Sequence, residues 1–396
     1  MDRFDVVVVG GGIVGLATAR AVAASGRSVA VLEAEERVGT HQTGHNSGVI
    51  HSGLYYRPGS HKARLTVHGG RELVAFCEAE GIPYDRCGKV VVATREEELE
   101  ALRELERRGH ANGLTGVRRA GLAELRELEP EVAGIEGLVV PEAGVVDYAQ
   151  VAARIAERLV HDGHPVMTGR RVVEIAPVTD GRIVATDVGE PVTGETIVAC
   201  AGLHSDRVAR MAGLEPPVRI VPFRGEYYAL APERASLVRA LVYPVPDPRF
   251  PFLGVHFTRR IDGTVEVGPN AVLAAGRHHY RGSRPDLREL LETVAGRDFL
   301  RLARTYWRTG AAEMVRSRSR HLYARAARAL IPAVAASDLR PAGAGVRAQA
   351  LGTDGALIDD FSILRSPGQV HVLNAPSPAA TASFAVGRHI AGLLDD

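Results

Sequence analysis

The sequence contains almost no lysine and little cysteine. Only Lys62 and Lys89 are lysines among its 48 basic residues, which argues against catalysis through a lysine Schiff base. The three cysteines, Cys77, Cys87 and Cys200, have neither metal-ligand spacing nor the pattern of a disulfide framework. Because such cysteine usage is typical of a reducing compartment, we expect a cytoplasmic protein without disulfides.

An excess of charge and a long apolar run are also missing. The net charge is only +1, so we expect no nucleic-acid partner. No apolar stretch approaches the roughly 20 residues needed to span a bilayer. The first core strand begins within five residues of Met1, so we expect no signal peptide. A chain of 396 residues that is 45% hydrophobic and 24% charged is typical of a globular protein with two domains.

A strand, a helix and a second strand are predicted at the beginning of the chain. The β-branched run at residues 6–9 suits a strand that is buried on both faces. Residues 13–24 read as a helix that Gly26 ends, and residues 28–32 read as the next strand, followed by Glu33.

The turn between the first strand and the helix carries the pattern G-x-G-x-x-G, made by Gly10, Gly12 and Gly15. One glycine permits the tight turn, one lets backbone N–H groups reach a pyrophosphate, and one lets the helix pack closely on the strand. The positive end of the helix favours phosphate, and Glu33 can accept hydrogen bonds from a ribose diol. The sequence therefore predicts a dinucleotide site.

A polar loop follows at residues 34–56. Three of its small side chains could reach phosphate or ring oxygens: Thr43, Asn46 and Ser47. His41 and His45 have the i, i+4 spacing of metal ligands, but no cysteine or acid is evident as a third ligand. We therefore expect no metal site.

The rest of the chain alternates between the two predicted domains. We assign residues 1–80, 144–215 and 335–396 to a discontinuous cofactor-binding domain, and residues 81–143 and 216–334 to a substrate domain. Aromatic-rich strands at residues 221–230, 252–258 and 264–269 predict an antiparallel sheet in the second domain.

An arginine-rich helix is predicted at residues 298–330, and two interpretations of it stay open. A basic amphipathic helix can lie on an anionic membrane surface. Alternatively, its apolar stripe packs on the sheet and its arginines face water. The first interpretation implies peripheral contact with the inner face of the cell membrane.

Three features favour FAD over NAD as the dinucleotide. The glycine motif lies at the extreme N-terminus, a long polar loop follows the ribose acid, and we expect the late segment 343–347 (GAGVR) to return to the first domain. No second G-x-G-x-x-G exists for a nicotinamide. The reduced substrate should therefore hand its hydride directly to the flavin, as in an oxidase or dehydrogenase.

Several longer motifs resemble one family. They are GHNSGVIHSGLYYRPGS (44–60), VPFRGEYY, YPVPDPRFPFLGVHFTRRIDG (243–263), VGPNAV, GVRAQAL and NAPSPAATASFAVG (374–387). Together they resemble the L-2-hydroxyglutarate dehydrogenase/oxidase family of D-amino-acid-oxidase-like flavoproteins, across essentially the whole chain. The resemblance implies an α/β fold of the glutathione-reductase type: a Rossmann-like FAD-binding domain and an α+β substrate domain built on an antiparallel sheet.

The same resemblance implies an activity. It is the oxidation of L-2-hydroxyglutarate to 2-oxoglutarate, with electrons passed to a quinone or to oxygen. An amino-acid oxidase or another 2-hydroxy-acid oxidase of the same fold is the alternative. No covalent attachment motif is evident, so we expect non-covalent FAD.

The reaction needs a base for the hydroxyl proton, and histidine is the usual choice near neutral pH. The resemblance points to His51 as the first candidate, because the loop that carries it is similar to a flavin-facing segment. His256 is the second candidate, and it could instead orient a substrate carboxylate.

A dicarboxylate also needs cationic partners, for which arginine offers a bidentate fork. Arg347 occupies the place where the wider family holds the carboxylate beside the reacting carbon. Arg224, Arg259 and Tyr243 are the candidates for the distal carboxylate. The resemblance further implies cofactor contacts, with the backbone of Val173 at the adenine; these contacts are His45, Val173, Gly202, Gly345, Ala375, Pro376 and Ser377.

Overall fold

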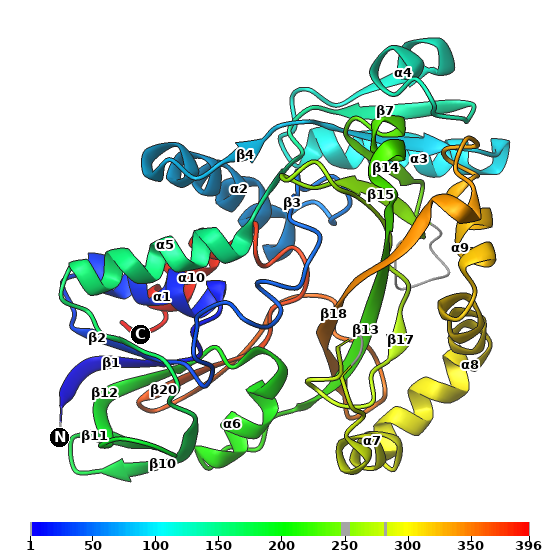
Figure 1. Ribbon diagram of the computed structural model, residues 1–396. Coiled ribbons are helices and arrows are strands. Elements are labelled where there is room, and N and C mark those ends of the chain that lie inside the picture. Colours follow the sequence, from blue (N-terminus) through cyan, green and yellow to red (C-terminus); the bar gives the residue numbers. More distant parts are fainter. Residues whose placement is uncertain (1, 247–253, 281–282, 396) are drawn as a thin grey trace.

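Two sheets organise the chain. The computed structural model describes residues 2–246, 254–280 and 283–395. Figure 1 shows the two sheets side by side, each with helices on its outer side. We call the elements around the sheet that begins the chain the first part, and those around the other sheet the second part.

The first part is built on an eight-stranded sheet whose centre is parallel. The valine run of β1 is buried between β2 and β12, and both pair with it in parallel. The parallel strands are β1 (Arg3–Val9), β2 (Val29–Leu32), β9 (Val166–Met167), β12 (Val192–Ala199) and β20 (Gln369–Asn374). Antiparallel strands extend the sheet: β10 (Val172–Val178), β11 (Gly181–Thr186) and β19 (Ser362–Ser366).

Helices from distant parts of the sequence cover this sheet (Figure 1). They are α1 (Ile13–Ala24), α2 (His61–Glu80), α5 (Tyr148–His161) and α10 (Ser383–Gly392). Phe76 of α2 and Phe384 of α10 contact each other with ring centroids 5.0 Å apart. The short helix α6 (Ser205–Met211) packs on β20 and β13. The first predicted strand–helix–strand unit is therefore formed where the glycine pattern placed it.

The second part is built on a nine-stranded sheet with the order β17-β13-β16-β15-β14-β5-β7-β6, to which β18 adds beside β13. Its strands are β5 (Lys89–Ala93), β6 (Arg118–Gly121), β7 (Glu136–Val140), β13 (Val218–Leu230), β14 (Leu241–Pro244), β15 (His256–Arg259), β16 (Val265–Gly268), β17 (Val272–Leu273) and β18 (Leu339–Gly352). Most pairs are antiparallel, but β14 and β5 run in parallel. Residues 252 and 253 of the predicted strand 252–258 lie outside the described residues.

The longest pairing of the molecule joins the two longest strands, β13 and β18. β18 therefore belongs to the second sheet by its hydrogen bonds, although the sequence placed residues 335–396 with the first domain. The reason is that β18 spans both parts, since its Ala348 amide also donates to Gln42 Oε1 in the first part, at 3.0 Å. The domain boundaries stay a prediction.

Helices lie on the far side of the second sheet, above it and at its lower end (Figure 1). They are α3 (Leu99–Ala111), α4 (Leu122–Leu128), α7 (Leu287–Val294), α8 (Arg297–Ser317) and α9 (Arg320–Ala327). The predicted helix 298–330 is divided in two, because the Ser319 hydroxyl accepts from the Leu322 amide and begins α9. Short 3-10 helices lie between the main elements: η1 (Glu96–Glu98), η2 (Gly202–His204), η3 (Pro232–Leu237) and η4 (Ala336–Asp338).

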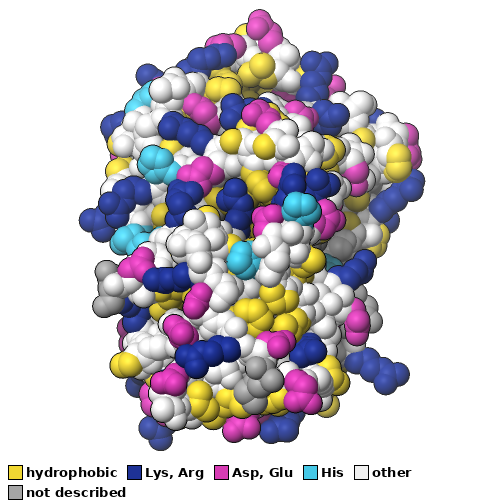
Figure 2. All heavy atoms as spheres, turned by 90° about the vertical axis from the view of Figure 1, so that its left-hand side faces the viewer, with side chains coloured by type: hydrophobic (Ala, Val, Ile, Leu, Met, Phe, Trp, Pro, Cys, Tyr) yellow, Lys and Arg dark blue, Asp and Glu magenta, His cyan; other side chains and the backbone are white. Residues whose placement is uncertain are grey.

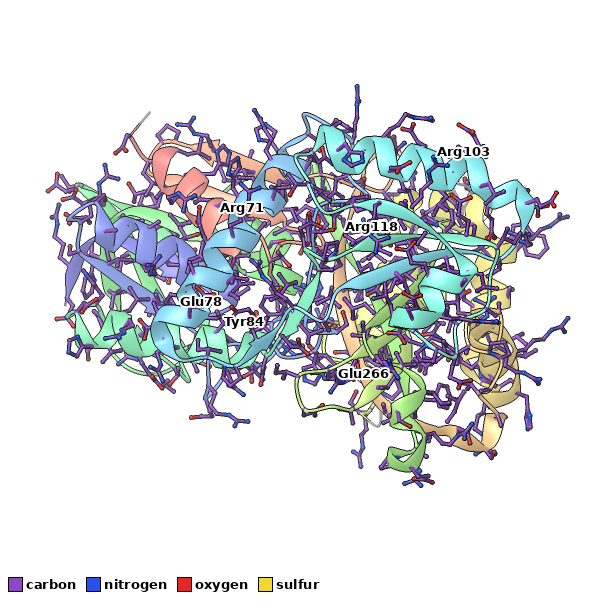
Figure 3. All side chains as sticks on the ribbon, turned by 90° about the horizontal axis from the view of Figure 1, so that it is seen from above. Arg71, Glu78, Tyr84, Arg103, Arg118 and Glu266 are labelled. Carbon is purple, nitrogen blue, oxygen red and sulfur yellow. The ribbon has the colours of Figure 1, made fainter. Side chains whose placement is uncertain are left out.

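A three-stranded sheet connects the two parts: β3 (Val49–Ile50), β4 (Tyr84–Asp85) and β8 (Gly144–Val146). In the view from above, Tyr84 lies beside Glu78 of α2, and its hydroxyl donates to that carboxylate (Figure 3). The face on the left of Figure 1 carries basic and acidic side chains interspersed (Figure 2). Within the described ranges, no helix has the length and apolar character needed to cross a membrane.

Candidate active site

The glycine turn after β1 leaves the beginning of α1 open to a ligand. Gly10 has φ of 111°, and a Cβ there would lie 2.5 Å from the carbonyl oxygen of Cys200. A Cβ at Gly15 would collide with the Gly10 carbonyl oxygen. By contrast, the nearest atom to a Cβ at Gly12 would be Thr43 Oγ1, at 3.5 Å. The turn is therefore tightly packed where the glycine pattern requires it and uncrowded at Gly12, as a pyrophosphate site needs.

Glu33, at the end of β2, faces this turn. Its side chain is buried, Oε2 accepts from the Gly11 amide at 2.6 Å, and Oε1 accepts from the Glu35 amide at 2.9 Å. Each carboxylate oxygen keeps a second acceptor position. A buried carboxylate held in this way fits the ribose of FAD, so the residues present suit the cofactor.

The polar loop after Glu33 is braced from within. The Asn46 amide nitrogen donates to the carbonyl oxygens of Gln42 and Thr43, and its oxygen accepts from the Gly48 amide. The Thr43 hydroxyl accepts from the Ile13 amide at 3.0 Å, at the first residue of α1. Direct contacts of Thr43 and Asn46 with FAD stay predictions. Ser47 is half-buried in the same loop.

The second part holds this loop from the other side. Arg260 donates to the Asn46 carbonyl oxygen at 3.0 Å and pairs with Glu266 at 3.1 Å, and Glu266 lies near the boundary between the two parts in Figure 3. A Cβ at Gly345 would collide with the carbonyl oxygen of His45. Gly345 therefore allows β18 to approach the loop closely. Its contact with the cofactor stays a prediction.

Other predicted cofactor residues follow the ends of parallel strands. Gly202 follows β12, and Ala375, Pro376 and Ser377 follow β20. Because β1, β12 and β20 are parallel, these segments meet at the same edge of the sheet as the glycine turn, where ligands bind in open α/β sheets. Val173 lies on β10 with its side chain exposed. The contacts of these residues with FAD stay predictions.

His51 and His256 come together between the two parts. His51 follows β3, and its amide donates to the Thr381 hydroxyl at 3.1 Å. Burial holds the pKa of His51 well below its ordinary value, and the positive charge of Lys89 and the nearby imidazole of His256 lower it further. Both candidate bases are thus close enough to influence each other.

His256 is held in one orientation. Its ring stacks on Tyr243 with centroids 3.9 Å apart, and its Nδ1 lies 2.8 Å from the Gly254 carbonyl oxygen. Nδ1 must therefore carry the proton, which leaves the lone pair on Nε2. Burial lowers the pKa of His256 to about 3, despite that hydrogen bond. His256 is consequently neutral at pH 7.

Two cations flank these rings. Arg347 is near enough to lower the pKa of His256, and it also hydrogen-bonds Tyr227. Lys89 lies with Nζ 4.2 Å from the centre of the Tyr243 ring and 5.2 Å from that of Tyr55. Sequence analysis found Arg347 and Tyr243 but missed Lys89 and Tyr55. The rarity of lysine could have pointed to Lys89, because both lysines of the chain are buried.

The other two arginines predicted for the substrate lie elsewhere. Arg224 pairs with Glu226 at 2.7 Å and contacts His279 at 3.1 Å. Arg259 donates to the Arg239 carbonyl oxygen at 3.2 Å. Because successive side chains of a strand point to opposite faces, Arg259 and His256 face opposite sides of β15. Neither arginine has a described contact with His51 or His256, and their substrate contacts stay predictions.

The expectation that His41 lacks an acidic neighbour is wrong. The loop folds back so that His41 Nε2 lies 3.1 Å from Glu35 Oε1, while its Nδ1 lies 3.0 Å from the Tyr280 hydroxyl. Within the described part of the chain, ligand atoms of Glu35, His41 and His278 lie within 4.8 Å of one another. His278 Nε2 is in turn 2.9 Å from His204 Nε2. The prediction of no metal site stays a prediction.

Comparison with known proteins identifies relatives along the whole chain. The sequence profile of the DAO family, described as FAD dependent oxidoreductase, matches residues 5–393. The L-2-hydroxyglutarate dehydrogenase of Indibacter alkaliphilus is 50% identical over 387 residues, which cover 97% of each chain. The enzyme of the same name from Escherichia coli K12 is 44% identical, over 98% of this chain and 92% of the relative. The human mitochondrial one is 42% identical, over 98% and 88%.

Solved structures share the fold at lower identity. The L-alpha-glycerophosphate oxidase from Mycoplasma pneumoniae, with FAD bound, superposes with a TM-score of 0.79 at 23% identity and covers 100% of this chain and 96% of that one. Glycine oxidase from Geobacillus kaustophilus gives 0.74 at 20%, over 100% and 95%. The predicted fold and the FAD cofactor are thus confirmed. The chain belongs to the DAO family of FAD-dependent oxidoreductases, in the group that contains the L-2-hydroxyglutarate dehydrogenases.

Proposed function

We propose that the protein oxidises L-2-hydroxyglutarate to 2-oxoglutarate and passes the electrons to a quinone or to oxygen. The observation that carries this proposal is the 42–50% identity, over nearly the full length, to relatives named L-2-hydroxyglutarate dehydrogenase. The arrangement between the two parts supports it, because Lys89 and Arg347 lie near two imidazoles that burial keeps neutral. A hydroxy acid needs cations to bind its carboxylates and a neutral imidazole to accept its hydroxyl proton.

Each residue has a role in this reaction. Bound FAD supplies the acceptor for the hydride that leaves C2 of the substrate. The hydroxyl proton leaves to a neutral imidazole, for which His51 is the first candidate and His256, through Nε2, the second. Arg347 binds the carboxylate beside C2 with its guanidinium fork. Burial favours the neutral form of both histidines, so either can accept a proton at pH 7.

The first test is an anaerobic mixture of the purified yellow protein with L-2-hydroxyglutarate. We expect the flavin absorbance to bleach with the L enantiomer and to persist with the D enantiomer. Admitting air or a soluble quinone then identifies the acceptor by the rate of reoxidation. Bleaching with an L-amino acid and release of ammonia, in protein that ignores L-2-hydroxyglutarate, would instead establish the amino-acid oxidase alternative.

We also propose that FAD is held without a covalent bond. The three thiols are poor nucleophiles, because burial raises the pKa of Cys77 and of Cys87 to about 11 and that of Cys200 to about 12. Acid precipitation should therefore release all the flavin into the supernatant. Yellow colour that stays with the precipitate would contradict the proposal.

We further propose that the protein is cytoplasmic and that α7 and α8 contact the inner face of the cell membrane. Phe299 and Leu302 of α8 pack against the second sheet, but large apolar side chains elsewhere on the two helices are exposed. These are Leu287 (66%), Leu291 (65%), Leu300 (47%), Trp307 (62%), Met314 (48%) and Val315 (59%). Arginines accompany them on α8, and this combination suits the boundary of an anionic bilayer.

Vesicle flotation tests this contact. The holoenzyme should float with vesicles that contain anionic phospholipid at low salt, and Trp307→Ala should weaken the binding. Leu128→Ala, at an exposed leucine of α4, is the matched control and should leave it unchanged. Equal flotation of the three proteins, or none for the wild type, would refute the contact.

A further inference from the structure

Lys89 is a buried lysine that has no acidic partner in the part of the chain that the structure describes. Lys89 is only 3% exposed. Among the described residues, no carboxylate forms an ion pair with its ammonium group. Burial lowers the pKa of Lys89 to about 7. The other lysine, Lys62, is buried too, but its Nζ pairs with Asp359 Oδ1 at 2.9 Å. Because lysines are rarely buried unless they are paired, the isolation of Lys89 calls for an anionic ligand.

The strand register places Lys89 on the face of the second sheet that carries Tyr243. Lys89 is paired with Leu241 across β5 and β14, so the side chains of Lys89, Leu241 and Tyr243 share a face. Nζ lies 4.2 Å from the centre of the Tyr243 ring, and the His256 ring stacks on the same ring with centroids 3.9 Å apart. Lys89 therefore lies on the same face of the second sheet as Tyr243, whose ring contacts the candidate base His256.

Arg347 reaches the same rings from a different strand. Arg347 lies on β18 and influences Tyr243 and His256, whereas Lys89 lies on β5 and influences His51 and His256. The two histidines thus lie between two basic residues on non-adjacent strands of the sheet. Lys62 also influences His51, but it already pairs with Asp359. A ligand with two separated carboxylates matches this arrangement better than one with a single carboxylate.

We propose that Lys89, framed by Tyr55 and Tyr243, is the binding site for the carboxylate remote from the reacting carbon, while Arg347 binds the near one. This inference rests on the proposed function and names the group that selects a dicarboxylate. It also replaces Arg224 and Arg259 in that role, because described partners hold both of them elsewhere. The tyrosine rings stabilise the ammonium through their faces when it is cut off from water.

The experiment compares two substrates of equal chain length. L-2-hydroxyvalerate matches L-2-hydroxyglutarate except that a methyl group replaces the distal carboxylate. Lys89→Met should lower kcat/KM for L-2-hydroxyglutarate by about 10- to 100-fold, the usual effect of losing one charged hydrogen bond. It should leave kcat/KM for L-2-hydroxyvalerate nearly unchanged. Lys89→Arg, which keeps the charge, should recover part of the preference.

Lys62→Met is the matched control, because Lys62 is also buried but already pairs with Asp359. It should leave the ratio of the two kcat/KM values unchanged. A ratio that is the same in Lys89→Met and the wild type, or an equal loss on both substrates, would overturn the role of Lys89. If Lys89→Met does not retain FAD, Lys89→Gln and Lys89→Arg provide the same comparison.

Binding of unreactive analogues separates this inference from the proposed function. Glutarate and butyrate, titrated into the oxidised holoenzyme and followed by the flavin spectrum, report the site without turnover. Wild type should bind glutarate more tightly than butyrate, and Lys89→Met should lose that difference. If L-2-hydroxyglutarate is not oxidised but the difference is present, the proposed function fails and the Lys89 site stands. If the wild type shows no difference, the Lys89 site fails.

Discussion

Thr381 anchors the segment that carries His51, and Thr381→Val tests that anchor. The side chain of Thr381 is completely buried. Its hydroxyl contacts the Tyr148 hydroxyl at 2.7 Å, accepts from the His51 amide at 3.1 Å and lies 3.3 Å from the Val49 carbonyl oxygen. Valine has the same shape but no hydroxyl, so the change removes these bonds with little change in volume.

The loss of stability caused by Thr381→Val depends on which polar groups lose their only hydrogen-bond partner. The Tyr148 hydroxyl can still donate to the Val49 carbonyl oxygen at 2.9 Å, so both of those groups stay satisfied. The His51 amide has no described substitute for its acceptor. An unsatisfied buried donor costs about 1–3 kcal/mol, and the added methyl group returns about 0.8 kcal/mol. We expect a net loss of about 0.2–2 kcal/mol in the free energy of unfolding.

The assay combines a thermal shift with anaerobic stopped-flow measurement of flavin reduction. Besides the lower melting temperature, we expect reduction about 10-fold slower with normal FAD content, because small displacements of a catalytic group are costly. Thr66→Val is the control. Thr66 is equally buried, and its hydroxyl only donates to the Lys62 carbonyl oxygen of the preceding helical turn. If Thr381→Val behaves like Thr66→Val in both measurements, the reasoning about the anchor is refuted.

The other predictions concern the base, the near carboxylate and acid stability. His51→Ala should slow flavin reduction by about 10²–10⁴-fold if His51 is the base, while His68→Ala, at an exposed position of α2, should not; near-normal reduction by His51→Ala with bound FAD would remove that role. Since burial holds the pKa of His51 well below 6.5, the rate of flavin reduction at saturating L-2-hydroxyglutarate should stay constant from pH 8 to 6.5 and decline only below that; a decline already complete at pH 6.5 would contradict this. Arg347→Lys should raise KM for L-2-hydroxyglutarate by about 10- to 100-fold, because a point charge replaces a bidentate fork; an unchanged KM would exclude Arg347 from the site. His371 is fully buried, and burial lowers its pKa from 6.5 to about 4. The unfolded chain therefore binds more protons between pH 6.5 and 4, stability falls as the pH falls through this window, and at pH 5 the loss from this group is about 2 kcal/mol relative to pH 7. In His371→Gln the melting temperature should consequently fall less between pH 7 and 5 than in the wild type or in the exposed control His161→Gln; identical falls in all three would contradict the assignment.

Much of the first part could be predicted because its signals are local. The valine run, the glycine turn and Glu33 lie within about 30 residues and obey backbone rules that apply to any parallel sheet. The break between α8 and α9 was missed, although Ser319 is a good helix cap. A continuous amphipathic pattern does not reveal which apolar positions find a partner, and most of those on α8 do not.

The sequence by itself determined the class of fold, the dinucleotide site and, through its longer motifs, the family. It did so because strand and turn preferences, the steric freedom of glycine and the motifs themselves are properties of short stretches of chain. Only the tertiary structure decided which basic side chains lie near His51 and His256, since that depends on pairing between strands far apart in the sequence. The register of β5 with β14 brings Lys89 to Tyr243, whereas alternation along β15 turns Arg259 away from His256. The partners of Glu35 and His41 were likewise settled by the folding of a loop, whose path depends on contacts with the second part.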